Sequence, residues 1–123
     1  MSSYILWLDS EHAKIYPLVK GDGSSMDLVP REHNPSHIPN GQDRKLFFHK
    51  VAEDLKVATE IYVLGGKLIT HEFKHHCENH NHKQVAKAIV GIDTIDGHAR
   101  ESEVIGKGKE FYKKLHQFTK LPV

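Results

Sequence analysis

The histidine-rich stretch THEFKHHCENHNHK, residues 70–83, holds the densest set of chemically active side chains in this sequence: five histidines, two glutamates and the only cysteine. Its letters from His71 to His75 spell H-E-x-x-H. On a helix this spacing places two histidines on one face, where they can bind zinc, and the glutamate can act as the general base of a peptidase. Metal-dependent hydrolysis is therefore the first function to weigh.

The apolar residues of the same stretch argue against a peptidase. A helix that orients zinc ligands must be held rigidly against the protein, which requires a wide apolar face. Leu68, Phe73 and Cys77 give this helix only a thin apolar stripe. We therefore interpret it as a solvated helix rich in imidazole and predict neither a metal site nor a cofactor. Zinc binding through His71 and His75 is retained as an alternative.

Three carboxylates suggest a second enzymatic alternative, a metal-dependent nuclease. Such nucleases gather carboxylates that hold two Mg²⁺ ions about 4 Å apart. Asp9 follows the first expected strand, Asp93 follows the last one, and Glu53 lies on an expected helix. The central strand, however, ends in Gly65 and Gly66, where such a site needs an acidic residue. We therefore interpret Asp9 and Asp93 as turn or capping residues.

A polar loop ahead of a helix is the best candidate for binding. The segment HNPSHIPNGQDRK combines amides, imidazoles and cations, which can all contact phosphates or ribose hydroxyls of RNA. The candidate RNA-binding residues are His33, His37, Asn40, Gly41, Gln42, Arg44 and Lys45. No catalytic residue is predicted among them.

The first third of the chain has the pattern of an antiparallel meander. Tyr4–Leu8 and Ala13–Val19 are rich in β-branched and aromatic residues and flank the turn-forming letters DSEH, which predicts a hairpin. Pro17 indicates an exposed or irregular position in the second strand. Met26–Pro30 is expected to form a third strand, and Arg31–Gln42 a long loop.

The remainder of the chain alternates between helix and strand. A helix is expected from Asp43 onward, because apolar residues recur there at helical spacing. These residues are Phe47, Phe48, Val51, Leu55 and Ala58. Residues 60–66 and 84–93 are expected to be strands on either side of the histidine-rich helix, and Asp96 is expected to cap a final helix. This order predicts an α/β protein whose five-stranded mixed sheet carries helices on its faces, a ribonuclease H-like arrangement.

The composition is that of an ordinary globular protein. The 123 residues, 38% hydrophobic and 27% charged, fit one domain spanning residues 1–123. We expect neither a signal peptide nor a membrane span, because the apolar run YILWL is short and is followed by Asp9. A single cysteine agrees with a reducing compartment, so the expected location is the cytoplasm.

Positive charge is concentrated near the C-terminal end. The formal net charge is only +1, but residues 100–123 contain six Lys or Arg against three acids. Eleven histidines add to this, because an imidazole can gain a proton beside a phosphate. The charge distribution therefore favours a polyanionic partner that contacts the final helix.

Several phrases of the sequence resemble the central domain of eukaryotic and archaeal class I release factors and Pelota. The matching phrases are ILWLDSEHAKIYPL, DRKLFFHKVAEDL, EIYVLGG and AIVGIDTIDGHARESEVIGKGKEFY, which together cover most of the chain. Their order is most similar to that of the bacterial stand-alone relatives of this domain, the translational machinery proteins. The resemblance implies a translation-related role, with the ribosome or a structured RNA such as tRNA as partner.

The same resemblance gives meaning to the polar loop. In release factors the equivalent loop carries a Gly-Gly-Gln tripeptide, whose glutamine helps water to hydrolyse peptidyl-tRNA. Here the letters are Asn40, Gly41 and Gln42, so Gln42 corresponds to that glutamine while the first glycine is replaced. The residues hold no codon-reading domain, so we do not expect independent stop-codon recognition. The leading hypothesis is a non-catalytic factor that binds RNA or the ribosome; a peptidyl-tRNA esterase acting through Gln42 is the alternative.

Overall fold

The computed structural model describes residues 2–9, 12–18, 31–33, 44–79 and 81–120, and for residues 31–33 and 117–120 it describes the backbone only. The strands are β1 (Ser3–Leu8), β2 (Ala13–Leu18), β3 (Arg31–His33), β4 (Glu60–Gly65) and β5 (Ile89–Thr94). The helices are α1 (Arg44–Asp54), α2 (Lys67–Asn79), α3 (Lys83–Ala88) and α4 (Glu101–Lys120).

The strands form one mixed sheet in the order β3-β2-β1-β4-β5. β1 lies in the middle, where it pairs antiparallel with β2 and parallel with β4. β5 continues the parallel part beyond β4, and β3 continues the antiparallel part beyond β2. The prediction of a mixed α/β fold with helices on the sheet is confirmed.

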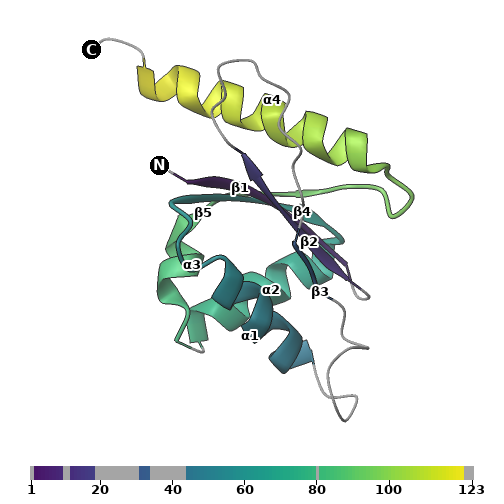
Figure 1. The fold of residues 1–123 in the computed structure, drawn as a ribbon, viewed down its shortest axis with the longest axis vertical. Helices are drawn as coiled ribbons and strands as arrows, with labels where there is room; N and C mark the ends of the chain where they lie inside the picture. The colour runs from purple at the N-terminus through teal and green to yellow at the C-terminus, as the bar shows by residue number, and fades with distance from the viewer. Residues whose placement is uncertain (1, 10–11, 19–30, 34–43, 80, 121–123) are drawn as a thin grey trace.

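Helices cover both faces of the sheet, as Figure 1 shows. α1, α2 and α3 pack on one face, and α4 is the helix of the described residues that lies across the other. The alternation of β1 explains this division, because Leu6 and Leu8 belong to the core under α1 and α2, whereas Ile5 belongs to the core under α4. β4 has a continuous apolar sequence because both of its faces are covered: Ile61 through Leu64 are all at most 1% exposed.

Pro17 is accommodated for a simple topological reason. It pairs with Tyr4 of β1, but β3 pairs with β2 only from Ala13 to Ile15. The position of Pro17 therefore has a strand on one side only in the described sheet, where a missing backbone N–H is tolerated. The expectation from sequence is confirmed.

The structure corrects one predicted loop and one predicted strand. Arg31–His33, expected to begin a loop, is strand β3, while the expected third strand Met26–Pro30 lies outside the described residues. Residues 84–93 were expected to be one strand, but Lys83–Ala88 is helix α3 and only Ile89–Thr94 is strand β5. Alanine and lysine are good helix formers, and this local preference explains the short helix in the first half.

Three smaller expectations also fail. Leu68, assigned to the apolar stripe of the histidine-rich helix, is 78% exposed, and Ile69 is buried in its place. Leu55 and Ala58, both assigned to the first expected helix, lie beyond α1, which ends at Asp54. Asp96 does not cap α4; its carboxylate accepts a hydrogen bond from the backbone N–H of His98, and the helix begins later, at Glu101.

Within the described residues, no helix is long and apolar enough to cross a membrane.

Candidate nucleic-acid interface

Polar contacts hold α4 against the sheet at its start and again farther along the helix. Near the start of the helix, the Tyr16 hydroxyl donates a hydrogen bond to Glu101 (2.9 Å), and Lys14 lies 3.6 Å from the same carboxylate oxygen. Farther along, the Tyr112 hydroxyl donates to the backbone carbonyl of Tyr4 (2.7 Å). These contacts fix the rotation of the helix about its axis, because each uses a side chain that points toward the sheet.

A contact between a histidine and a glutamate holds the later part of α4. His116 Nε2 lies 2.9 Å from Glu60 Oε1, and the Ser3 hydroxyl donates a hydrogen bond to the same oxygen (2.7 Å). Both side chains of the His116 and Glu60 pair are less than a fifth exposed. The opposite, outward side of α4 is consequently presented to solvent in a fixed orientation.

Close packing beneath α4 depends on two glycines. A Cβ added at Gly108 would lie only 2.1 Å from Cδ1 of Ile5, so the absence of a side chain lets the helix approach β1. A Cβ at Gly91 of β5 would lie 2.7 Å from Phe111. The Phe111 ring uses this space to stack on Tyr62, with 3.9 Å between ring centroids and 4° between planes.

A shallow hollow of about 300 Å³ opens where α4 passes over β4 and β5. It is lined by Tyr62, Asp93, Lys107, Glu110, Phe111 and Lys114. The Tyr62 hydroxyl donates a 2.5 Å hydrogen bond to Asp93. Burial, together with this hydrogen bond, raises the pKa of Tyr62 well above its usual value, so the phenol stays neutral. The hollow thus combines an aromatic wall with two lysines and two carboxylates.

Exposed lysines give the outward side of α4 a basic surface. Lys107, Lys109, Lys113 and Lys114 are all exposed, whereas Glu110 is the single acid among residues 107–116. Lys114 lies 3.5 Å from Glu110, in an exposed pair that is worth little. Lys109 and Lys113 follow each other by one helical turn. The arrangement suits phosphate groups along a nucleic-acid backbone.

The predicted loop residues are only partly described. Arg44 and Lys45 begin α1, and both are exposed. The Arg44 guanidinium donates a hydrogen bond to Glu72 of α2 at 2.8 Å, which compensates its charge. His33 is the last residue of β3 and is opposite Ala13 of β2. His37, Asn40, Gly41 and Gln42 lie outside the described residues.

The structure does not place the described loop residues beside the lysines of α4. Arg44 and Lys45 belong to the helical layer on one face of the sheet, and α4 lies on the other face (Figure 1). The described part of the chain therefore offers two separate basic surfaces.

The three carboxylates of the nuclease alternative do not form one close group among the described residues. Asp9 accepts a hydrogen bond from the backbone N–H of His12 in the β1–β2 turn, as a turn residue does. Asp93 lies within β5 and is bonded to Tyr62, while Glu53 is on α1. Among the described residues, the single group of three or more metal-binding side chains in close reach contains neither aspartate.

The H-E-x-x-H letters lie on a solvated surface. His71 and His75 are both exposed on α2, and a carboxylate oxygen of Glu78 lies 4.0 Å from Nδ1 of His75. No described third ligand completes a site with them. The interpretation of α2 as a largely solvated helix agrees with these positions, although Ile69, Thr70, Phe73 and Cys77 give it a fuller buried face than predicted.

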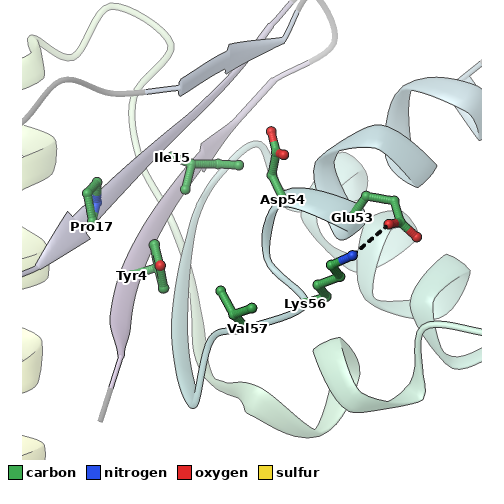
Figure 2. Close-up of a pocket in the computed structure, with 7 residues that line it drawn as sticks. All are labelled: Tyr4, Ile15, Pro17, Glu53, Asp54, Lys56 and Val57. Atoms are coloured by element: carbon green, nitrogen blue, oxygen red, sulfur yellow. Dashed lines mark ion pairs between the residues drawn. The ribbon is translucent and has the colours of Figure 1, made fainter.

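A further pocket of about 360 Å³ lies at the end of α1 (Figure 2). It is lined by Tyr4, Ile15, Pro17, Glu53, Asp54, Lys56 and Val57. Glu53 and Lys56 form an ion pair at 3.7 Å along its rim. With two carboxylates against one ammonium group, this pocket repels a polyanion and is a poor candidate for RNA. It contains none of the predicted RNA-binding residues.

Sequence reasoning missed one cluster of side chains. His49 and Glu53 of α1 lie beside His82, which precedes α3. The spacing of His49 and Glu53, four residues apart on an expected helix, was the available signal. The third member comes from a turn whose position only the tertiary structure determines.

Comparison with solved structures finds translation factors. The chain is similar to Archaeoglobus fulgidus Pelota, with a TM-score of 0.63 and 16% identity over 89% of this chain and 31% of that chain. Thermoplasma acidophilum Pelota gives a TM-score of 0.62 and 13% identity over 87% of this chain and 31% of that chain. An archaeal translation termination factor gives a TM-score of 0.51 and 18% identity, over 97% and 42% of the two chains.

These similarities confirm, at the level of the fold, the resemblance to Pelota and release factors that the sequence indicated. The chain spans less than half the length of each of these proteins. No protein-family model matches the sequence, and no curated protein sequence matches it either.

Proposed function

We propose that this chain is a relative of the central domain of Pelota and class I release factors, and that it binds the ribosome or a structured RNA such as tRNA. Its role is translation-related and non-catalytic, and it acts in the cytoplasm as one domain of ribonuclease H-like topology. The observation that carries the proposal is the similarity in fold to translation factors over almost the whole chain.

Two features of the described residues support RNA as the partner. The first is the exposed row of lysines on α4, held in one orientation by Glu101, Tyr112 and His116. The second is that the one described group of metal-binding side chains in close reach contains Glu53 but neither Asp9 nor Asp93. Contacts between lysines and phosphates account for the first feature. Such binding does not require the Mg²⁺ chemistry of a nuclease.

The polar loop belongs to the same proposal as a second contact. It comprises His33, His37, Asn40, Gly41, Gln42, Arg44 and Lys45, the residues chosen from the sequence. Lys45 is exposed at the start of α1, a position from which a side chain can reach a phosphate near the helix N-terminus. In this arrangement a large RNA contacts α4 and the loop from different sides of the sheet.

The test measures tRNA binding by fluorescence anisotropy across a series of salt concentrations. The variant Lys109→Gln/Lys113→Gln removes two charges from α4. The matched control Lys83→Gln/Lys87→Gln removes two exposed charges from α3, on the opposite face of the sheet. If both α4 lysines contact phosphates, the negative slope of log K against log salt becomes shallower by roughly 1.4 to 1.8 in the α4 variant and stays unchanged in the control.

A parallel measurement asks whether the partner is a ribosome. The chain is added to ribosomes, sedimented through a sucrose cushion and compared with the α4 variant and the α3 control. Loss of sedimentation in the α4 variant alone supports the proposal. Equal losses in the two variants, or tRNA binding that ignores salt, would overturn it, because a net-charge effect or a non-electrostatic contact would then explain the data.

A further inference from the structure

Three side chains with metal-binding atoms meet between α1 and the turn before α3. His49 Nδ1 lies 2.9 Å from His82 Nε2, and Glu53 joins them so that all three ligand atoms lie within 4.8 Å of one another. His49 and Glu53 are four residues apart on α1, which places them on one face of the helix. The two rings share a hydrogen bond at this contact, and the Glu53 carboxylate lies within reach of both nitrogens.

The turn between α2 and α3 holds His82 firmly in this position. Asn81 has a positive φ of 67°, a conformation that asparagine tolerates better than most residues. The backbone N–H of His82 donates to the carbonyl of Cys77 at 3.2 Å, and its own carbonyl accepts from Ala86 at 3.1 Å. This is the pattern of a Schellman motif at a helix end, followed directly by the next helix.

Burial restricts the His82 ring further. Its residue is only 8% exposed, and its ring lies nearly parallel to that of His76, with 6.0 Å between centroids. His49 and Glu53, in contrast, are exposed. One ligand is therefore fixed by the core, and the other two leave an open path from solvent, which is what a site needs if an ion is to enter it.

We propose that His49, Glu53 and His82 bind a divalent transition-metal ion, with Zn²⁺ as the first candidate. Two imidazole nitrogens and one carboxylate are a donor set suited to zinc, and a fourth position is left for water or another ligand. Mg²⁺ and Ca²⁺ prefer oxygen ligands and are poorly matched by two histidines. The site is separate from the RNA-binding surface proposed for α4.

The distances fit such an ion after small movements. With zinc–nitrogen bonds of about 2.0–2.1 Å, two ligands of a tetrahedron are separated by roughly 3.3 Å. The His49 and His82 nitrogens, now 2.9 Å apart, must separate by a few tenths of an ångström. Glu53 also pairs with Lys56 at 3.7 Å, but both side chains are about half exposed or more, so the pair is weak and the carboxylate can turn toward the ion.

Isothermal titration calorimetry of the full chain with ZnCl₂, in a buffer that does not chelate zinc, tests this assignment. We expect one ion per chain. His49→Ala and Glu53→Gln change exposed residues and should weaken binding at least about tenfold, since even the loss of an outer partner of a ligand often costs this much. The matched control is His71→Ala/His75→Ala, which removes two exposed histidines from α2 and should leave the affinity unchanged.

Two further readouts separate ligand loss from misfolding. Co²⁺ added to the wild-type chain should give the visible absorption of a site with nitrogen ligands and low coordination number, and His49→Ala should remove it. Zn²⁺ should raise the unfolding temperature of the wild type and of the α2 control but not of His49→Ala, while Mg²⁺ raises none of them. No zinc uptake by the wild type, or uptake lost in the α2 control and kept in His49→Ala, would overturn the proposal.

Discussion

Two glycines in the same helix should respond to alanine in opposite ways. At Gly106 of α4 an added Cβ has no neighbour within 4 Å, so Gly106→Ala should gain the helix propensity of alanine, about 1 kcal/mol in the free energy of unfolding. At Gly108 the same gain is opposed, because the new Cβ would lie 2.1 Å from Cδ1 and 2.6 Å from Cγ1 of Ile5.

The size of the opposing term follows from the environment of Ile5. Its side chain is 0% exposed, so it cannot swing into solvent, and overpacking a core of this kind costs about 1–3 kcal/mol. The propensity gain is common to both variants and cancels between them. Gly108→Ala should therefore unfold with about 1–3 kcal/mol less free energy than Gly106→Ala.

Urea denaturation followed by circular dichroism measures both variants. A third variant, Gly108→Ala/Ile5→Val, removes the closest atom, Cδ1, and should be less destabilised than the sum of its two single changes. If Gly108→Ala proves as stable as Gly106→Ala, then α4 does not press on β1 in solution, and the account of its fixed orientation is wrong.

Four further outcomes concern three other residues, Cys77, Tyr112 and Arg44. Burial raises the pKa of Cys77 to about 12, so iodoacetamide should alkylate the native thiol far more slowly than the unfolded one. The thiol of the unfolded chain ionises at lower pH than the buried one, so the contribution of Cys77 to stability is complete below pH 9 and is lost as pH rises toward 12. Cys77→Ala should reduce this dependence of the unfolding free energy on pH in urea titrations. Tyr112→Phe leaves the Tyr4 carbonyl without its hydroxyl donor and should lower the unfolding free energy by about 0.5–1.5 kcal/mol. Arg44→Ala breaks an exposed pair with Glu72, and thermal unfolding should show a loss below about 1 kcal/mol.

The parts of the fold that the sequence predicted well are those with a strong local signal. The apolar run of β4 was recognisable because both faces of that strand are buried, and Phe47 and Val51 identified α1 through their helical spacing. Helix α3 was missed because six residues are too few for a helical period to show. Strand β3 was missed because three polar residues, Arg31–His33, form a strand only through pairing with β2.

The candidate sites divide in the same way. The lysines of α4 were visible as a basic C-terminal region, although nothing local showed that Glu101, Tyr112 and His116 would fix which side they face. His82 contacts His49 across 33 residues of sequence, and that contact depends on how the α2–α3 turn packs against α1. The H-E-x-x-H residues instead face solvent, and no described side chain supplies a third ligand to them. The motif in sequence could not show this, because a third ligand comes from elsewhere in the fold.

The central place of β1 has a consequence for how the molecule folds. Its parallel partner β4 arrives late in the chain: Ser3 meets Glu60 across 57 residues. Forming contacts this distant in sequence requires closing a long loop, which costs conformational entropy before the contacts stabilise the fold, and folding is slower as a result. Truncations that end before β4 should therefore leave the hairpin of β1 and β2 without a stable structure. The sheet is completed around β1, its first strand in the chain, only after β4 is available.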